Sequence, residues 1–295
     1  MHLPLCAVLF AAVTLPSATG ARAAMAQGTP ATAVSAMTCA AGAVADVPAL
    51  RWQGDASLKS ATWKVALGPR RVSARIVVVD VDPARVALSL DLARNGGVLM
   101  PWTLNAAPDT VLLAMNAGQF TDEGPWGWVV HRGREWQQPG VGPLSGAFVV
   151  DSAGGVRIVA ARAIDSVQAA GRVREALQSF PLLLEQGRPS RVLCDPTATL
   201  DREHRDIRLA LGVRADGHLL IALSRYDGAG RFAERLPIGP TTMEMSAIMR
   251  RLGAVDALML DGGLSAQLLL RHGTITQRWD GLRSVPLALV GHRIP

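Results

Sequence analysis

The stretch IRLALGVRADGHLLIAL, residues 207–223, decides the fold class of this 295-residue chain. Two aliphatic runs, 207–213 and 218–223, lie on either side of the polar letters RADG. Apolar runs of this length that flank an Asp-Gly turn are typical of an antiparallel β-hairpin. The stretch therefore predicts a sheet whose neighbouring strands run in opposite directions.

Similar patterns recur on both sides of this hairpin. They predict further hairpins over residues 72–92, 146–160 and 266–279. Single strands are expected over 110–115 and 127–131, and a short strand buried on both faces over 256–260. No internal repeat is visible among these segments.

Helix signals are fewer. Residues 166–178 carry apolar side chains at helical spacing and predict an amphipathic helix. Residues 242–252 do the same, and Thr241 before them forms a capping box with Glu244, which satisfies free N–H groups of the first turn. The expected fold class is therefore α+β, a mostly antiparallel sheet with a few packed helices in a single domain.

The composition favours a folded chain that does not bind nucleic acid. Hydrophobic residues make up 49% of the chain and charged residues 18%, which allows a sizeable core and excludes a wholly disordered chain. The formal net charge is +6, and nearly all of the basic residues are arginine. No arginine run is dense enough for a nucleic-acid arm, so we expect dispersed charge and a few contacts to phosphate or carboxylate.

The N-terminal region differs from the rest of the chain. An apolar run over 3–15, followed by small residues, is typical of an export signal over residues 1–24, and an uncleaved anchor is the alternative. We expect residues 25–69 to form a flexible lead-in and N-terminal extension, and residues 70–295 to form the domain. No later stretch is long and apolar enough for a membrane span. The mature chain is therefore expected to be periplasmic or secreted, with no stable membrane span.

Cys39 and Cys194 are the cysteines outside the predicted signal. An oxidising compartment would permit a disulfide between them, and two separate buried thiols are the alternative. No spacing of cysteine and histidine resembles a zinc site.

The segment Asp261-Gly262-Gly263-Leu264-Ser265 follows the strand predicted over 256–260. A carboxylate at the end of a buried strand can be presented in a cleft, and the two glycines allow a ligand to approach closely. Their N–H groups can form an anion-binding concavity, and Ser265 adds a hydroxyl. The alternative is an ordinary tight turn in which the aspartate accepts backbone hydrogen bonds.

Asn116 and Gly118 follow the strand over 110–115 in the same way. An asparagine side chain can both donate and accept hydrogen bonds, which suits a sugar hydroxyl, although a turn would explain this segment as well. Indole rings can pack against sugar rings or in the core, and the candidates downstream are Trp126, Trp128 and Trp136.

Arg208 lies in the otherwise apolar run 207–213, on the strand face of Ala210 and Gly212. These small neighbours leave room over that face for an anion. A buried arginine needs a partner, because burying an unpaired charge is costly. A structural ion pair with a carboxylate such as Asp261 is the alternative, and such a pair could itself be functional.

Four segments, taken in order, resemble a known family. NAGQF at 116–120 resembles Asn-Gly-Gly-Phe-Phe, FPLLLEQG at 180–187 resembles Gly-Pro-x-Leu-Leu-x-x-Gly, RLALG at 208–212 resembles Arg-Thr-Ala-Ile-Gly, and 241–265 resembles a terminal helix leading into Leu-Asp-Gly-Gly-Gly-Ser. The family is the phosphodiester glycosidase domain, and the resemblance covers roughly residues 70–292. The departures from its pattern are Ala117, Gln119, Leu209 and Leu264.

The resemblance implies cleavage between a sugar anomeric carbon and a phosphodiester oxygen. The leaving phosphate monoester departs readily as an anion, so the site must mainly hold the phosphate and stabilise an oxocarbenium-like transition state. Arg208 suits the first role, and Asp261 suits the second as stabiliser, base or nucleophile. The catalytic candidates are Asp261, Arg208 and Asn116, and the substrate-binding candidates are Gly118, Gly262, Gly263 and Ser265.

A second carboxylate is desirable for this chemistry. The candidates are Asp122, Glu123, Asp206 and Glu244, of which Glu244 is expected to be committed to its capping box. No ligand set for a cofactor is legible in the sequence, although acidic loops and a phosphate substrate would both attract a divalent cation.

We therefore expect an exported hydrolase that acts on a glycosyl phosphodiester in an envelope or extracellular glycan. Its partner would be that sugar phosphodiester or glycan substrate. The alternative is a non-catalytic carbohydrate- or phosphoglycan-binding protein of the envelope, which would keep the cleft without turnover.

Overall fold

The computed structural model describes residues 39, 42–95, 97–228 and 230–295. The export signal expected over residues 1–24 lies outside these residues, as do residues 25–38 and 40–41 of the expected lead-in and N-terminal extension. The described residues from 39 to 295 group into one compact unit. Every strand pairing in the described part is antiparallel, and helices are few, so the expected α+β domain is confirmed.

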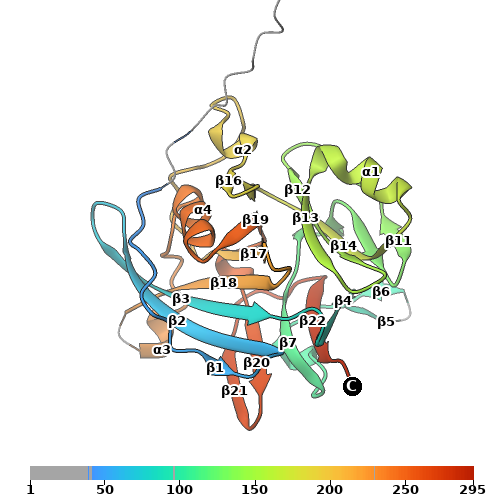
Figure 1. Ribbon diagram of the computed structural model, residues 1–295, viewed down its shortest axis with the longest axis horizontal. Helices are drawn as coiled ribbons and strands as arrows, with labels where there is room; N and C mark the ends of the chain where they lie inside the picture. The colour runs from blue at the N-terminus through green and yellow to red at the C-terminus, as the bar shows by residue number, and fades with distance from the viewer. Residues whose placement is uncertain (1–38, 40–41, 96, 229) are drawn as a thin grey trace, which may run out of the picture. The chain divides into compact units, whose positions relative to one another are not determined.

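The largest sheet has eight strands (Figure 1). Its order is β1 (Gln53–Gly54), β2 (Leu58–Leu67), β3 (Val72–Val81), β18 (Leu219–Tyr226), β17 (Leu209–Arg214), β19 (Ala254–Met259), β15 (Leu182–Glu185) and β16 (Arg188–Pro189). The hairpin predicted over 207–223 is confirmed as β17–β18, with Leu209 opposite Leu223. Residues 53–67, within the expected N-terminal extension, supply two strands of this sheet.

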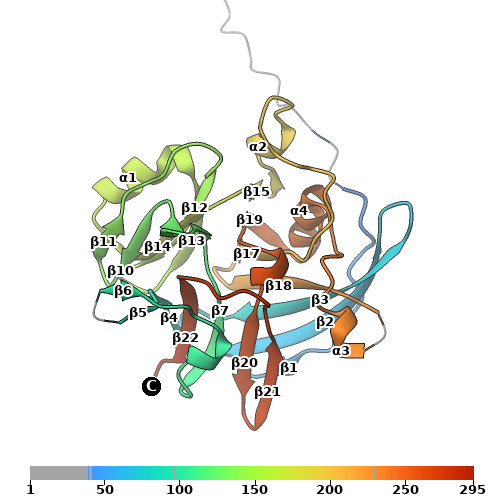
Figure 2. The same ribbon diagram turned by 180° about the vertical axis from the view of Figure 1, so that it is seen from behind.

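Two five-stranded sheets complete the strand framework (Figures 1 and 2). One has the order β11 (Arg134–Gln137), β10 (Val129–His131), β14 (Val173–Ser179), β12 (Gly146–Asp151) and β13 (Val156–Ala160). The other has the order β21 (Ile275–Trp279), β20 (Leu268–His272), β7 (Val111–Asn116), β22 (Ala288–Arg293) and β4 (Val86–Asp91). Two small hairpins are β5 (Arg94–Asn95) with β6 (Val98–Leu99), and β8 (Gln119–Thr121) with β9 (Gly124–Trp126).

The central strands of the eight-stranded sheet, β3, β18 and β17, are buried on both faces. On one face, α4 (Thr242–Arg251) packs Met245, Ile248 and Met249 against alternate residues of the sheet. The other face meets side chains of both five-stranded sheets, including Met115 and Phe148. Strands that are covered on both faces become almost continuously apolar, and this explains the aliphatic runs that identify them in the sequence.

The other helices are short. They are α1 (Ile164–Ala169), α2 (Arg191–Cys194) and α3 (Gly230–Ala233). The predicted capping box of α4 is confirmed, since the Glu244 N–H donates to Thr241 Oγ1 (3.2 Å) and the Thr241 N–H donates to Glu244 Oε2 (2.9 Å). No helix in the described ranges has the length and apolar character needed to cross a membrane.

The hairpin predicted over 72–92 is wrong. β3 pairs with β2 and β18, whereas β4 pairs with β22, so the two runs belong to different sheets. The intervening turn, in which the Val86 N–H donates to the Asp82 carbonyl (3.0 Å), works as a corner. Val81 before the turn and Leu88 after it are buried in the same hydrophobic core. The chain therefore passes at this turn from the eight-stranded sheet on one side of that core to a five-stranded sheet on the other.

The helix predicted over 166–178 is also largely wrong. α1 ends at Ala169, and residues 173–179 form β14 at the centre of a five-stranded sheet. Gly171 has φ +64°, a left-handed conformation that ends a helix and that glycine adopts easily. Pairing on both sides, with β10 and β12, then satisfies the backbone of β14, which apolar spacing alone could not reveal.

Cys39 and Cys194 form a disulfide, which decides between the two alternatives left open by the sequence. The bond joins the lead-in to α2. Val44, a few residues further on, is buried against the α4 face of the large sheet.

Candidate active site

The loop after β19 is tied at both ends to the end of β7. Asn116 Nδ2 donates to the Asp261 carbonyl oxygen (2.9 Å), and Asn116 Oδ1 accepts from the Gln267 N–H (2.9 Å). Asn116 is only 1% exposed. Its side chain therefore acts on the loop from within the core, by positioning the backbone of Asp261.

Gly118 joins the same loop from the other side. The Asp261 N–H donates to the Gly118 carbonyl (3.2 Å), and Gly118 has φ +70°. Next to it, Gln119 Nε2 reaches the Phe180 carbonyl (3.4 Å). Ser179 Oγ in turn donates to the Met259 carbonyl (2.7 Å), so the segments around 118, 180 and 260 form one hydrogen-bonded unit.

The segment before β17 packs directly on the two glycines. The Gly263 N–H donates to the Ile207 carbonyl (2.8 Å). A Cβ on Gly262 would lie 2.3 Å from the Ile207 oxygen, and one on Gly263 would lie 2.9 Å from Asp206 Oδ2. The glycines are therefore needed for close packing of two backbones, and this packing places the Asp206 carboxylate beside the loop. The Gly263 N–H predicted to bind phosphate already has a protein acceptor.

Asp261 lies half-buried at the centre of this unit. Burial raises the pKa of its carboxyl above the ordinary value, and the neighbouring Asp206 carboxylate adds in the same direction. The Ser265 side chain, the Arg283 charge and the Gly262 N–H act in the opposite direction. The site thus contains two carboxyl groups that repel each other when both are charged. The positive charge of Arg283 offsets part of this repulsion.

Of the four candidates for a second carboxylate, the structure brings Asp206 to Asp261. Glu244 is occupied by structural contacts, as expected: it forms the capping box, and Arg205 donates to both of its carboxylate oxygens (2.7 and 2.8 Å). Asp122 and Glu123 lie on the exposed β8–β9 turn, and Asp122 contacts Arg283 at 3.5 Å. Among the described residues, no group of three or more His, Cys, Asp or Glu side chains is arranged as metal ligands would be.

Arg208 stands immediately before β17 and is not paired with Asp261 in the described contacts. Its Nε donates to the Pro240 carbonyl (3.3 Å) and its Nη2 to the His204 carbonyl (2.7 Å). Burial lowers the pKa of this guanidinium, and the charges of Asp206 and Asp201 act against that effect. Arg208 therefore holds the 204–208 segment in place beside the loop.

Arg283 is a site residue that the sequence analysis missed. Its N–H donates to the Leu264 carbonyl (3.0 Å), its guanidinium lies 4.9 Å from the centre of the Phe120 ring, and its side chain is 56% exposed. It is thus an accessible cation close enough to Asp261 to lower the pKa of that carboxyl. A lone arginine in the segment between β21 and β22 carries no periodic signal that could have identified it.

The three tryptophans that were candidates for sugar contacts differ in their surroundings. Trp126 packs edge-on against Phe180, with ring centroids 6.2 Å apart, beside the candidate site. Trp128 is buried and donates from Nε1 to Glu135 (2.8 Å), so it belongs to the core. Trp136 is 43% exposed on β11.

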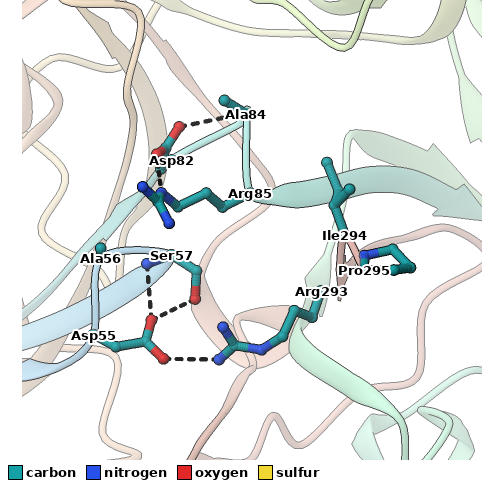
Figure 3. Close-up of a pocket in the computed structure, with 9 residues that line it drawn as sticks. All are labelled: Asp55, Ala56, Ser57, Asp82, Ala84, Arg85, Arg293, Ile294 and Pro295. Carbon is teal, nitrogen blue, oxygen red and sulfur yellow. Dashed lines mark hydrogen bonds and ion pairs between the residues drawn. The ribbon is translucent and has the colours of Figure 1, made fainter.

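A separate hollow of about 690 Å³ lies at the end of β22 (Figure 3). Its charged residues are already paired, Arg293 with Asp55 (2.8 Å) and Arg85 with Asp82 (3.1 Å). None of the residues lining it is a candidate for the predicted chemistry. The candidate active site is therefore assigned to the converging loops around Asp261.

Comparison with known proteins agrees with these features. A sequence model described as phosphodiester glycosidase matches residues 109–290, well over half of the chain. The catalytic domain of zebrafish N-acetylglucosamine-1-phosphodiester alpha-N-acetylglucosaminidase, auto-inhibited by its pro-peptide, has a TM-score of 0.60 at 13% identity, covering 86% of this chain and 88% of that one. A hypothetical protein from Synechocystis has a TM-score of 0.54 at 17% identity, covering 83% of this chain and 64% of that one.

No curated protein sequence matches the chain. The two structural likenesses show a shared fold, and the sequence match confirms the resemblance found in the motifs. The chain belongs to the phosphodiester glycosidase family.

Proposed function

We propose that this protein is an exported hydrolase that cleaves the bond between a sugar anomeric carbon and a phosphodiester oxygen. The observation that carries the proposal is the convergence of Asp261, Asp206 and Arg283, which come from the segments after β19, before β17 and before β22. Two carboxyl groups and an accessible guanidinium are the groups that such a reaction needs.

The two carboxyl groups have different roles in this mechanism. A raised pKa makes the Asp261 carboxylate a stronger base than an ordinary aspartate, so it accepts a proton from the attacking water. The Asp206 carboxylate stabilises positive charge that develops at the anomeric carbon. The carbon–oxygen bond breaks with its electron pair on the phosphate oxygen, so the products are a free sugar and a phosphate monoester.

Arg283 binds the phosphate. Its ion pair with Asp122 is long, at 3.5 Å, and both partners are largely exposed, so this pair is weak and a phosphate can replace the carboxylate. A guanidinium can make a two-pronged contact with phosphate, which places the leaving oxygen next to the carboxyl pair. The Ser265 side chain bonds the Asp261 carboxyl and the Gly118 carbonyl accepts from the Asp261 N–H, so both hold Asp261 in position.

Two features support a location outside the cytoplasm. The first 24 residues have the pattern of an export signal, and the disulfide between Cys39 and Cys194 suits an oxidising compartment. The substrate would then be a glycan of the envelope or the extracellular space.

The proposal is tested by incubating the purified protein with a panel of sugar 1-phosphodiesters and measuring the release of free sugar. We expect turnover that Asp261→Asn and Asp206→Asn each reduce by about 100-fold or more. Asp109→Asn, which alters a fully exposed carboxylate next to Arg271, is the matched control and should leave the rate unchanged. Tight binding of these compounds without any turnover would instead identify a non-catalytic phosphoglycan-binding protein.

A further inference from the structure

A second surface with the chemistry of glycan binding lies on β11. Trp136 is 43% exposed there, and all four residues of the strand are exposed. The guanidinium of Arg134 lies 4.7 Å from the centre of the indole ring, and that of Arg94 on β5 lies 5.7 Å from it. These three residues are here called the Trp136 surface.

The positive charge of this surface follows from strand geometry. Arg134 and Trp136 are two residues apart on β11 and so share one face. Glu135 between them points to the other face, where its carboxylate accepts from Trp128 Nε1 (2.8 Å) and Gln168 Nε2 (2.6 Å). The only acidic side chain of the strand is therefore turned away from the indole.

The two arginines remain available to a ligand. Arg94 Nη1 donates to the Gly97 carbonyl (2.7 Å) within the β5–β6 hairpin. This hairpin lies beside β11 in both views of the ribbon (Figures 1 and 2). Neither Arg94 nor Arg134 has a carboxylate within ion-pair distance among the described residues. An anion approaching the indole would thus meet two cations that no carboxylate neutralises.

A hollow of about 20 Å³ lies next to the indole, which is room for a single hydroxyl group and not for a sugar ring. Leu92, Arg94, Pro125, Val129, Trp136 and Gln137 line it. Sugar rings present C–H groups that pack on indole faces and hydroxyls that bond amides and guanidinium groups. A sugar that carries a phosphate or carboxylate would lie over the exposed indole, with its anion on the guanidinium groups and one hydroxyl directed to the hollow.

One hairpin borders both this surface and the candidate active site. Pro125 on β9 lines the hollow and pairs with Phe120, over whose ring Arg283 lies. The next pair of the hairpin, Gln119 with Trp126, contacts Phe180 beside the Asp261 loop. A glycan bound at the active site can therefore continue across β8–β9 toward β11.

We propose that Trp136, Arg94 and Arg134 form a subsite for an anionic sugar unit of the glycan that the active site cleaves. The identity of that glycan as substrate rests on the proposed function, whereas the binding itself does not. The indole packs on the sugar ring, and the two guanidinium groups contact its phosphate or carboxylate.

The subsite is tested by calorimetric binding to the full chain carrying Asp261→Asn, so that turnover cannot consume the probe. The probes are phosphomannan fragments, the same fragments after removal of their phosphates, and inorganic polyphosphate. We expect the phosphorylated fragments to bind at least about tenfold more tightly than either of the others. Trp136→Ala should weaken that binding about tenfold, and Arg94→Gln with Arg134→Gln should abolish the preference for phosphorylated fragments.

The matched control is Trp52→Ala, because Trp52 is 38% exposed and has Lys59 at 5.2 Å from its ring. Thermal unfolding of each variant confirms that it is folded. Equal binding of phosphorylated and dephosphorylated fragments would overturn the subsite, as would equally tight binding of polyphosphate or equal effects of Trp136→Ala and Trp52→Ala.

A second readout separates the subsite from the proposed function. Binding that depends on Trp136 in a protein that releases no sugar from any phosphodiester would leave the subsite standing and refute the hydrolase. Sugar release with a KM for phosphomannan fragments that Trp136→Ala leaves unchanged would leave the hydrolase standing and refute the subsite.

Discussion

The side-chain amide of Asn116 donates to the main-chain carbonyl of Asp261 across 2.9 Å, between residues that are 145 positions apart in the sequence. The end of β7 therefore sets the position of the first residue of the candidate catalytic loop. Because Asn116 is buried, this contact fixes the candidate active site relative to the core.

Removing that contact should affect both stability and activity. Asn116→Ala leaves the Gln267 N–H and the Asp261 carbonyl without partners inside the protein, at a cost of about 1–3 kcal/mol for each group. We expect a lower free energy of unfolding and a lower kcat than the wild type. Denaturant titration and sugar release measure the two effects, with Asn105→Ala, an exposed partner of Arg278, as the control. An unchanged kcat would show that the loop is positioned without Asn116.

Gly263 and Gly273 provide a matched pair for testing close packing in the loop. Both have a positive φ, +55° and +60°, so alanine introduces similar backbone strain of about 1–2 kcal/mol at each. Only the Gly263 Cβ would meet another group, Asp206 Oδ2 at 2.9 Å, whereas the Gly273 Cβ meets nothing within 4 Å. We expect Gly263→Ala to reduce activity far more than Gly273→Ala at similar thermal stability. Equal losses of activity would contradict the placement of Asp206 beside the loop.

The raised pKa of Asp261 predicts how stability and activity depend on pH. The folded protein disfavours the charged carboxylate, so the protonated form favours folding at low pH, and this benefit is lost as the pH rises from 3.8 through the raised pKa. Asp261→Asn should therefore be more stable than the wild type at neutral pH, and the difference should shrink in acid. Activity should rise over the same window as the base becomes deprotonated. Melting curves and rates in a series of buffers test both, and a stability difference independent of pH would contradict the shift.

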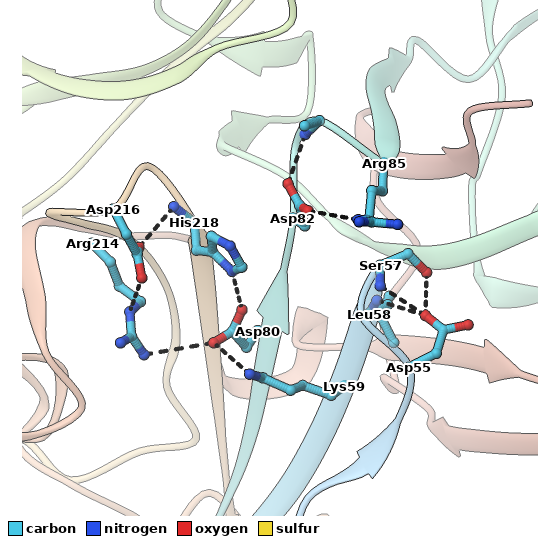
Figure 4. Close-up of polar contacts among 11 residues, drawn as sticks. Asp55, Ser57, Leu58, Lys59, Asp80, Asp82, Arg85, Arg214, Asp216 and His218 are labelled. Carbon is cyan, nitrogen blue, oxygen red and sulfur yellow. Dashed lines mark hydrogen bonds and ion pairs between the residues drawn. The ribbon is translucent and has the colours of Figure 1, made fainter.

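Asp80 is the centre of a charge cluster on β3 that we expect to support the large sheet (Figure 4). It is 4% exposed, and its carboxylate contacts His218 Nδ1 (2.6 Å), Arg214 (3.5 Å) and Lys59 (3.6 Å). Asp80→Asn removes the acceptor charge shared by three donors and should destabilise the protein by about 3–5 kcal/mol. Asp216→Asn, at a half-exposed carboxylate 3.4 Å from Arg214, should change stability by about 1 kcal/mol or less. Similar effects of the two substitutions in denaturant titrations would refute this role.

The disulfide closes a loop of 155 positions and should contribute strongly to stability. Cross-links of this kind restrict the unfolded chain, and their removal typically lowers the free energy of unfolding by about 2–5 kcal/mol. We expect Cys39→Ser with Cys194→Ser to unfold at a lower temperature than the oxidised wild type, and a reducing agent to affect only the wild type. A melting temperature of the wild type that is insensitive to reduction would count against the bond.

The local patterns of the sequence determined the elements whose signals are contained in a few neighbouring residues. The Asp-Gly turn between 207–213 and 218–223 sets the register in which the two strands pair, and the structure contains this hairpin as β17–β18. The capping box of Thr241 and Glu244 likewise depends on contacts within one helical turn, and α4 begins where it predicts. Residues 116, 208 and 261 were also identified as candidates, because polar side chains at the ends of apolar strands are unusual.

The tertiary structure alone decided how these pieces meet. β3 and β4 are adjacent in the sequence but belong to different sheets, because β3 pairs with β18 and β4 pairs with β22. Which strands pair depends on how the apolar side chains of each strand are buried in the folded protein. The site followed the same rule. Asn116 became a buried support for a residue 145 positions away, and Asp206 and Arg283 approached Asp261 from segments on either side of it in the sequence. No local pattern encodes such contacts.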